Sequence, residues 1–135
     1  MATHGSQLPT GTVTVTGIDH LVLNCADVEA TLAWYLDRLG LAPVRVDEWR
    51  NGDVPFPSVR INEHTIIDLT SGDHSAGRLD HFCLVIAPTD LDELAASGEF
   101  EVLDGPITRF GARGSGASLY IRDPDGTTIE LRHYA

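Results

Sequence analysis

One pattern occurs twice in this chain. It reads GIDHLVL in the first half and RLDHFCL in the second, and each copy places a histidine early in an apolar run. Each run is followed by a helix-like stretch and later by an apolar strand with one carboxylate, Asp68 or Glu130. The spacings nearly agree, because His20 precedes Asp68 by 48 positions (68 − 20) and His81 precedes Glu130 by 49 (130 − 81). A duplicated unit of this kind can bring four metal-type ligands to one centre.

Hydrophobic periodicity predicts the same order of elements in both halves. The elements expected in the first half are a strand over 14–24, a helix that Asp27 caps and Gly40 ends, and strands over 43–49, 59–61 and 64–70. Those expected in the second half are a strand over 79–87, a short helix capped by Thr89 or Asp90, and strands over 99–103, 118–122 and 127–133. The apolar stripe of the first helix comprises Val28, Leu32, Tyr35, Leu36 and Leu39. Residues 109–116, which include three glycines, are expected to form a mobile loop.

Composition excludes several classes of function. The 135 residues suffice for one domain, and their net charge of −11 disfavours binding to nucleic acids and anionic membranes. The chain contains no lysine, which excludes Schiff-base chemistry on an amine side chain. We find no apolar run of membrane-spanning length and no secretory signal, so we expect a cytoplasmic protein whose two cysteines are reduced. Residues 1–12 are expected to form a disordered leader.

Strand alternation indicates which side chains share a face. If His20 faces an interior, Val22 and Asn24 face it too, and His81 shares its face with Cys83. Taken singly, a strand histidine is more often structural and a strand carboxylate more often solvent-facing. Two histidines and two carboxylates at matching points of a repeat need another explanation, because burying such carboxylates unpaired is costly. A bound divalent cation removes that cost.

These residues resemble the vicinal oxygen chelate superfamily, which includes glyoxalase I, fosfomycin resistance proteins, extradiol dioxygenases and bleomycin resistance proteins. The resemblance covers residues 14–134 and depends on four segments, namely 18–23, 34–41, 79–81 and 120–131. It implies an α+β fold in which two βαβββ modules, 13–76 and 77–135 of a single domain, form curled mixed sheets around a central cavity. The small virulence-associated and glyoxalase-domain proteins of the superfamily look most similar in length and ending.

The resemblance also implies one divalent metal per site, held by His20, Asp68, His81 and Glu130, with Fe, Mn, Ni and Zn all open. It implies a homodimer with shared sites, in which His20 and Asp68 of one chain meet His81 and Glu130 of the other. At the second ligand position glyoxalase I carries Glu, and Asp68 is shorter by one methylene. If Asp68 does not reach the metal, two histidines and Glu130 remain as a ligand face suited to Fe(II) or Mn(II).

The implied activity is that of a divalent-metal-dependent enzyme acting on a small oxygen-rich metabolite as a lyase, isomerase or dioxygenase. The expected catalytic residues are Glu130, as a base, and Tyr120, as a proton donor. The expected substrate contacts are Asn24, Arg60, Ser118 and Arg122. Asn24 stands where bacterial glyoxalase I has an arginine for glutathione, which argues against that substrate. The alternative is a metal-free binding protein of the bleomycin-resistance type, whose cationic ligand the acidic charge would suit.

Overall fold

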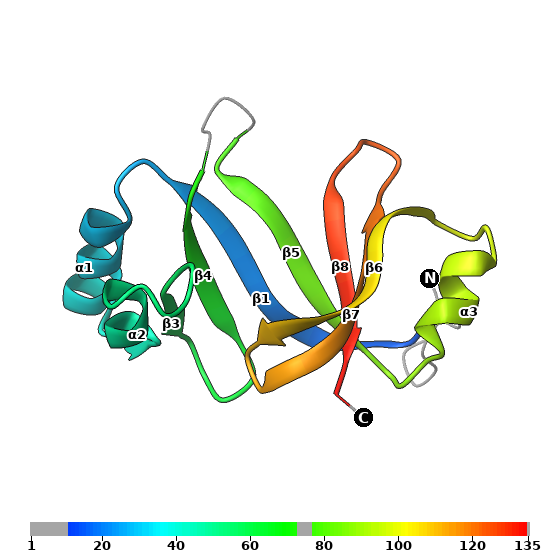
Figure 1. Cartoon of the computed structure of the whole chain (residues 1–135), viewed down its shortest axis with the longest axis horizontal. Helices are drawn as coiled ribbons and strands as arrows, with labels where there is room; N and C mark the ends of the chain where they lie inside the picture. Colours follow the sequence, from blue (N-terminus) through cyan, green and yellow to red (C-terminus); the bar gives the residue numbers. More distant parts are fainter. Residues whose placement is uncertain (1–10, 73–76, 135) are drawn as a thin grey trace, which may run out of the picture.

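The computed structural model of the chain describes residues 11–72 and 77–134, and Figure 1 shows how its elements are arranged. The first half contains β1 (Val15–Cys25), α1 (Val28–Leu39), β2 (Ala42–Val44), α2 (Val46–Arg50), β3 (Ser58–Arg60) and β4 (Ile66–Ser71). The second half contains β5 (Leu79–Ile86), α3 (Leu91–Ala96), β6 (Glu101–Gly111), β7 (Gly114–Arg122) and β8 (Thr128–His133). A strand, a helix and three strands thus occur twice, with α2 as an addition to the first half.

The strands of the described residues form one mixed sheet of eight, in the order β2-β3-β4-β1-β5-β8-β7-β6. In each half the first strand pairs in parallel with the last, β1 with β4 and β5 with β8. The two halves meet at the centre of the sheet, where β1 and β5 pair antiparallel (Figure 1). The predicted α+β fold of two βαβββ modules is therefore confirmed.

The sheet curls because the β6–β7 hairpin returns toward the first module. At the tip of this hairpin, the Ala112 N–H donates to the Asp19 carboxylate on β1 at 2.9 Å. The Arg60 guanidinium on β3 donates to the Ala112 carbonyl, also at 2.9 Å. In Figure 1 the hairpin crosses in front of the central strands. The curl thus produces a concave face over β1 and β5.

Two helices begin where a capping aspartate is predicted. The Asp27 carboxylate accepts a backbone N–H of the first turn of α1 at 3.1 Å, and the Asp90 carboxylate does the same for α3 at 3.0 Å. Gly40 ends α1 in the left-handed conformation, with φ of 66°. The apolar stripe of α1 is wrong at one position, because Leu39 is 55% exposed at the C-terminal end of the helix.

Each module has its own apolar core. The core beside α1 consists of Cys25, Leu32, Val46, Val59, Ile67 and Leu69. The core beside α3 consists of Ile86, Leu91, Leu94, Leu119, Ile121 and Leu131. Because α1 and α3 lie at opposite ends of the molecule (Figure 1), the two cores flank the middle of the sheet. The concave face between them is left for polar side chains.

Two predictions of local structure are wrong. Residues 43–49 do not form a strand, because Arg45 adopts a left-handed conformation with φ of 58°, which ends β2 at Val44 before α2 begins. Residues 109–116 are not a loop but the paired ends of β6 and β7 and the turn between them. Residues 1–10 of the predicted leader and the predicted module boundary at 76 lie outside the described residues. Within 11–72 and 77–134, no helix is long and apolar enough to cross a membrane.

Candidate metal centre

The repeated histidines and carboxylates meet at the junction of the two modules. Asp68 on β4 and Glu130 on β8 each pair with the residue two positions after the histidine of the adjoining strand, so both modules present their ligands with the same offset. All four side chains belong to one chain. Within one chain, the pairing of β1 with β5 already brings His20 and His81 together. The sharing of the site between two chains stays a prediction.

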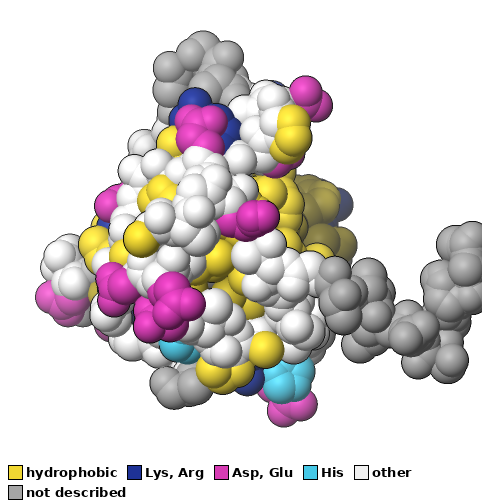
Figure 2. All heavy atoms as spheres, turned by 90° about the vertical axis from the view of Figure 1, so that its right-hand side faces the viewer, with side chains coloured by type: hydrophobic (Ala, Val, Ile, Leu, Met, Phe, Trp, Pro, Cys, Tyr) yellow, Lys and Arg dark blue, Asp and Glu magenta, His cyan; other side chains and the backbone are white. Residues whose placement is uncertain are grey.

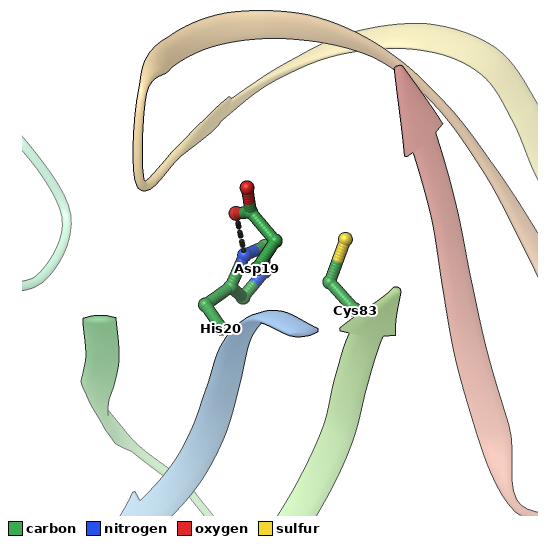
Figure 3. A group of neighbouring side chains, drawn as sticks. All are labelled: Asp19, His20 and Cys83. Carbon is green, nitrogen blue, oxygen red and sulfur yellow. Dashed lines mark hydrogen bonds and ion pairs between the residues drawn. The ribbon is translucent and has the colours of Figure 1, made fainter. Parts of the chain in front are cut away.

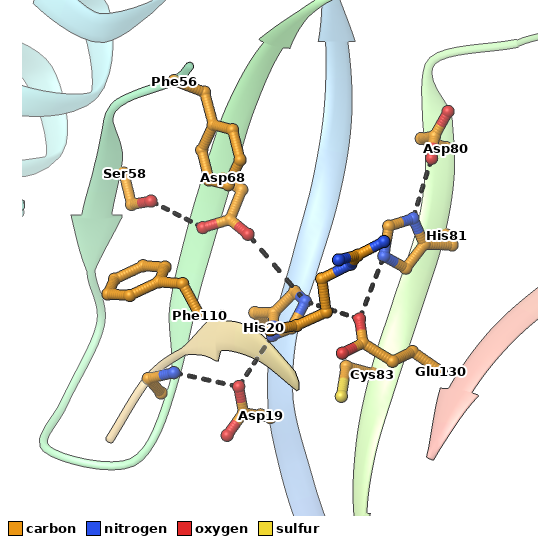
Figure 4. A network of polar contacts seen from close by, with 12 residues as sticks. Asp19, His20, Phe56, Ser58, Asp68, Asp80, His81, Cys83, Phe110 and Glu130 are labelled. Carbon is orange, nitrogen blue, oxygen red and sulfur yellow. Dashed lines mark hydrogen bonds and ion pairs between the residues drawn. The ribbon is translucent and has the colours of Figure 1, made fainter. Parts of the chain in front are cut away.

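Glu130 lies between the two imidazole rings. Its Oε1 is 3.1 Å from Nε2 of His20 and 3.2 Å from Nε2 of His81 (Figure 4). One donor atom from each of these three residues lies within 4.8 Å of the other two. Asp68 is more distant, with its Oδ2 3.8 Å from Nε2 of His20. The shorter side chain of Asp68 thus makes the centre asymmetric.

Each histidine is held by the aspartate that precedes it. Asp19 Oδ2 lies 2.7 Å from Nδ1 of His20, and Asp80 Oδ2 lies 2.7 Å from Nδ1 of His81 (Figure 4). Adjacent residues of a regular strand point to opposite faces, but the register between β1 and β5 shifts at Asp19 and again at Asp80. These two bulges let each carboxylate reach the ring that follows it. Both Nε2 atoms are thereby left to face Glu130.

Asp19 is fully buried and accepts three hydrogen bonds. Besides His20 (Figure 3), its donors are the Ala112 N–H and the Tyr134 hydroxyl. Burial alone would raise the pKa of Asp19, but the hydrogen bonds from His20 and Tyr134 hold it below its ordinary value. Neither Asp19 nor Asp80 is among the residues predicted from the sequence. The signal that could have revealed them is the repeated Asp-His dipeptide itself.

The second carboxylate oxygen of Glu130, Oε2, accepts hydrogen bonds from two side chains of the second module. Ser118 Oγ donates to Oε2 at 2.6 Å and Arg132 Nη1 at 3.2 Å, and both side chains are fully buried. Asp68 has a matching partner, because Ser58 Oγ on β3 donates to its Oδ1 at 2.5 Å. Each carboxylate of the quartet is thus positioned by a serine from the strand beside it.

Arg132 connects the centre to the β6–β7 hairpin. Its guanidinium donates to three main-chain carbonyls of the hairpin at 2.8 to 3.2 Å. Two glycines make room for it. A Cβ on Gly111 would lie 2.6 Å from Arg132 Cζ, and one on Gly116 would lie 2.6 Å from Arg132 Nη2. The glycines that predict a mobile loop therefore admit a buried guanidinium instead.

The carboxylates of the centre favour the protonated form of its two imidazole rings. Burial would lower the pKa of His20, but hydrogen bonds to Asp19 and Glu130 raise it to about 9. Burial opposes the charged form of His81 as well, and Glu130 and Asp80 raise its pKa above the ordinary value. Burial would raise the pKa of Glu130, but the two histidines hold it far below its usual range. A buried carboxylate between two imidazole rings of raised pKa is a place where a metal cation can compete with protons.

A cavity of about 620 Å³ adjoins the centre. Its wall includes the four predicted ligands and two further predicted residues, Asn24 and Tyr120. Tyr120 packs edge to face against His81, with ring centroids 5.5 Å apart. Burial and the charge of Glu130 raise the pKa of Tyr120 to about 12. Its hydroxyl therefore keeps its proton at neutral pH.

Three residues that are predicted as substrate contacts, Arg60, Ser118 and Arg122, do not line this cavity. Ser118 is buried and bound to Glu130. Arg60 donates to two main-chain carbonyls at 3.0 and 2.9 Å. Arg122 is exposed, with Nη1 3.9 Å from Oε2 of Glu101. Strand alternation predicts a face of a strand, but it does not predict how far along that strand a cavity extends.

The cavity wall also contains residues that the sequence does not single out. Arg45 and Arg109 line it, together with Phe56 and Phe110. The guanidinium carbon of Arg45 lies 4.9 Å from the ring centroid of Phe56 and 3.7 Å from that of Phe110. Burial lowers the pKa of Arg45, while the charge of Asp68 raises it, and an arginine stays charged at neutral pH. These residues belong to no repeated motif, so no signal in the sequence marks them.

A second group of potential ligands consists of Asp19, His20 and Cys83 (Figure 3). The carboxylate of Asp19 is engaged by Nδ1 of His20. Burial and the charge of Glu130 raise the pKa of the Cys83 thiol, so its sulfur keeps its proton and is a poor metal ligand. The ligand set of His20, His81 and Glu130 is therefore the better candidate.

A family model described as the Glyoxalase/Bleomycin resistance protein/Dioxygenase superfamily matches residues 17–131. The chain belongs to this superfamily. Virulence protein STM3117 of Salmonella typhimurium is 32% identical over 122 residues, which cover 87% of this chain and 83% of that protein. Glyoxalase domain-containing protein RDO1 of Mycosarcoma maydis is 34% identical over 127 residues, which cover 90% and 70%. The range that the family model matches includes all four predicted ligands.

Solved structures share the fold of this superfamily member. Methylmalonyl-CoA epimerase from Mycobacterium tuberculosis superposes with a TM-score of 0.62 at 22% identity, covering 94% of this chain and 93% of that one. The Mn(II)-bound glyoxalase from Novosphingobium aromaticivorans superposes with a TM-score of 0.68 at 24% identity, covering 90% of this chain and 40% of that one. At these identities the likeness shows the fold alone.

The donor set of this glyoxalase-superfamily chain fits a divalent metal ion. Two imidazole Nε2 atoms and a carboxylate oxygen converge, and each imidazole is backed by a carboxylate at its other nitrogen. That backing is the usual arrangement behind metal-bound histidines, because it orients the ring and makes its free nitrogen more basic. Imidazole and carboxylate together suit Mn, Fe, Ni or Zn.

Proposed function

We propose that this chain is a divalent-metal-dependent enzyme that acts on a small oxygen-rich metabolite as a lyase, isomerase or dioxygenase. The observation that carries the proposal is the convergence of His20 Nε2, His81 Nε2 and Glu130 Oε1 in the wall of a 620 Å³ cavity. These three are the proposed direct ligands. Asp68 is the proposed fourth donor, direct or through water, because its Oδ2 lies 3.8 Å from His20 Nε2.

Each polar group of the cavity has a proposed task. A bound divalent metal would supply Lewis acidity toward two vicinal oxygens of the substrate. Asp19 and Asp80 orient the two imidazole rings with Nε2 toward Glu130. Tyr120 remains protonated and packs on His81, so we assign it as a hydrogen-bond donor to negative charge that develops on the substrate. Asn24 supplies an amide on the same wall.

Glu130 is better suited to ligation than to proton abstraction. Its carboxylate interacts with both histidines, Ser118 and Arg132. The pKa of its carboxyl therefore lies far below its usual range, which makes it a weak base. A role as the general base requires that one oxygen first leave these donors.

A metal-free binding protein of the bleomycin-resistance type is the second candidate. Its support is the charge of the chain, nine basic against twenty acidic residues, and Figure 2 shows acidic side chains scattered over the end that carries α3. The cavity itself argues the other way, because its wall holds the converging ligand atoms of His20, His81 and Glu130, which suit a metal ion and which a metal-free binding protein does not need. The enzyme is therefore the better supported function.

Metal uptake tests the proposal. When chelator-treated protein is titrated with Mn(II) in a calorimeter, we expect about one equivalent bound per chain. Glu130→Ala should lose this binding, because it removes the carboxylate that lies between the two rings. Glu101→Ala removes the same charge from an exposed strand position and should bind normally. Equal uptake by the Glu130→Ala variant and the wild type would overturn the proposed centre, and no uptake by the wild type would favour the metal-free binding protein.

A further inference from the structure

Arg45 lies in the cavity wall, and within the described part of the chain most of its hydrogen-bonding capacity is unused. We propose that Arg45 binds the carboxylate group of the substrate, which is then a small monocarboxylate with a vicinal oxygen. This inference rests on the proposed function for the role of the centre and adds the charge of the substrate. Its support comes from the packing, the hydrogen bonds and the charges around Arg45.

The guanidinium of Arg45 is held in place by aromatic packing. Its carbon lies 3.7 Å from the ring centroid of Phe110 on β6 and 4.9 Å from that of Phe56. The residue itself has φ of 58° and ψ of 28°, the left-handed region, and it is the one non-glycine residue with positive φ in the described part of the chain. Such strained residues tend to occur where a side chain must be aimed for function.

The hydrogen bonds of Arg45 contrast with those of the other arginines near the centre. Within residues 11–72 and 77–134 it makes one, from Nη2 to the Phe56 carbonyl at 3.5 Å, which is long for such a bond. Its buried Nε has no partner among these residues, which is also true of the Nε of Arg132. Arg132 makes four hydrogen bonds and Arg60 makes two at 3.0 and 2.9 Å. The free guanidinium edge of Arg45 therefore has donors to offer to a ligand.

The charges of the cavity favour a monoanion over a dianion. Asp68, Asp80 and Glu130 all line the wall, so a dianionic phosphate would meet more repulsion there than a carboxylate does. The planar guanidinium also matches the two oxygens of a carboxylate. Arg109 is the weaker candidate for this role, because it is exposed and its Nη2 lies 3.8 Å from a carboxylate oxygen of Asp104.

Two probes of nearly the same shape test the proposal. Pyruvate and its neutral amide, pyruvamide, both present vicinal oxygens and differ in charge. Calorimetry on Mn(II)-loaded protein should show pyruvate binding at least about tenfold more tightly, the gain expected for a hydrogen bond between charged groups. Because Mn(II) itself prefers a carboxylate, the comparison is repeated on chelator-treated protein. Arg45→Gln should lower the preference by about tenfold in both forms.

The control is Arg122→Gln, which removes the same charge outside the cavity and should keep the full preference. If the Arg45→Gln variant prefers pyruvate as strongly as the wild type does, the proposal is wrong. The role that remains for Arg45 is then to offset the negative charge of Asp68. Tighter binding of inorganic phosphate than of pyruvate would also overturn it. If the wild type does not bind Mn(II), the proposed function is wrong but the proposal for Arg45 is not. The comparison of pyruvate with pyruvamide on chelator-treated protein tests Arg45 without the metal.

A measurement on the wild type keeps the proposal testable if the Arg45→Gln variant does not fold. Phenylglyoxal modifies arginine side chains, and peptide mass spectrometry locates each modified residue. Pyruvate, but not pyruvamide, should slow the modification of Arg45 several-fold and leave that of Arg122 unchanged. Equal rates for Arg45 with both probes would contradict the assignment.

Discussion

At each histidine of the centre, the preceding aspartate determines which ring nitrogen faces the cavity. The two pairs differ in their surroundings. Asp19 is fully buried and has two further donors, whereas the Asp80 side chain is 51% exposed. Asp80 can therefore be changed without leaving a network of buried donors unsatisfied, which isolates its effect on His81.

Replacing Asp80 tests this orienting role. Asp80→Ala should weaken Mn(II) binding about 10- to 100-fold, because the His81 ring loses the partner that directs its Nε2 toward Glu130. The midpoint of urea unfolding should stay nearly unchanged, since the Asp80 side chain is half exposed. The matched control is Asp37→Ala, which removes an exposed carboxylate from α1 and should bind Mn(II) normally. Normal binding by Asp80→Ala would show that the ring needs no such partner.

The sequence predicts the quartet better than it predicts the residues around it. His20, Asp68, His81 and Glu130 could be found because a duplication repeats both their type and their spacing. The aspartate before each histidine is marked by the repeated Asp-His dipeptide, but its role is hidden because regular strand alternation places adjacent side chains on opposite faces. The bulges that reverse this rule depend on how β1 pairs with β5, a contact between halves of the chain that lie far apart in sequence.

At the scale of elements, the β6–β7 hairpin completes the site from the second module. Its tip contacts Asp19, its strands surround Arg132, and Phe110 near its end packs on Arg45. A run of glycines is ambiguous in a sequence, because it fits a flexible loop and equally a strand that must admit a large neighbour. In this chain the glycines lie in strands that admit a large neighbour, because the buried guanidinium of Arg132 on β8 packs against them.

Adding one methyl group to this hairpin tests its packing. Gly111→Ala would place a Cβ 2.6 Å from Arg132 Cζ and from Asp19 Oδ2, both of which are buried. We expect a loss of about 1–3 kcal/mol in the free energy of unfolding, measured with urea. Gly17→Ala is the control, because its Cβ would meet nothing within 4 Å and should leave stability nearly unchanged. Equal stability of both variants would contradict the close packing around Arg132.

At the scale of the whole molecule, one chain assembles the complete centre from two modules. The pairing of β1 with β5 joins the two modules, and the curl of the sheet places the β6–β7 hairpin over this junction. We retain the homodimer as a proposal, with a complete centre in each chain. The free energy of unfolding should then depend on the protons or the cation that the centre between the two modules binds.

The pH dependence of unfolding tests this coupling in chelator-treated protein. The pKa of His20 is raised to about 9 from 6.5, and that of His81 is raised too, so the folded chain holds protons that the unfolded chain has lost. Their contribution to stability is complete below about pH 6.5 and disappears as pH rises through 9, a decrease of up to about 3 kcal/mol. Urea unfolding of Glu130→Gln should show a weaker dependence. His64→Gln, which changes an exposed histidine, should behave like the wild type.

The most direct test of the account is the position of the metal itself. Crystals grown with Mn(II) and measured at the manganese absorption edge would show each ion as a peak of anomalous scattering. We predict one peak per chain, within bonding distance of His20 Nε2, His81 Nε2 and Glu130 Oε1 of the same chain. A peak at Asp19 and Cys83, a peak whose ligands come from two chains, or no peak beside Glu130 would contradict the account.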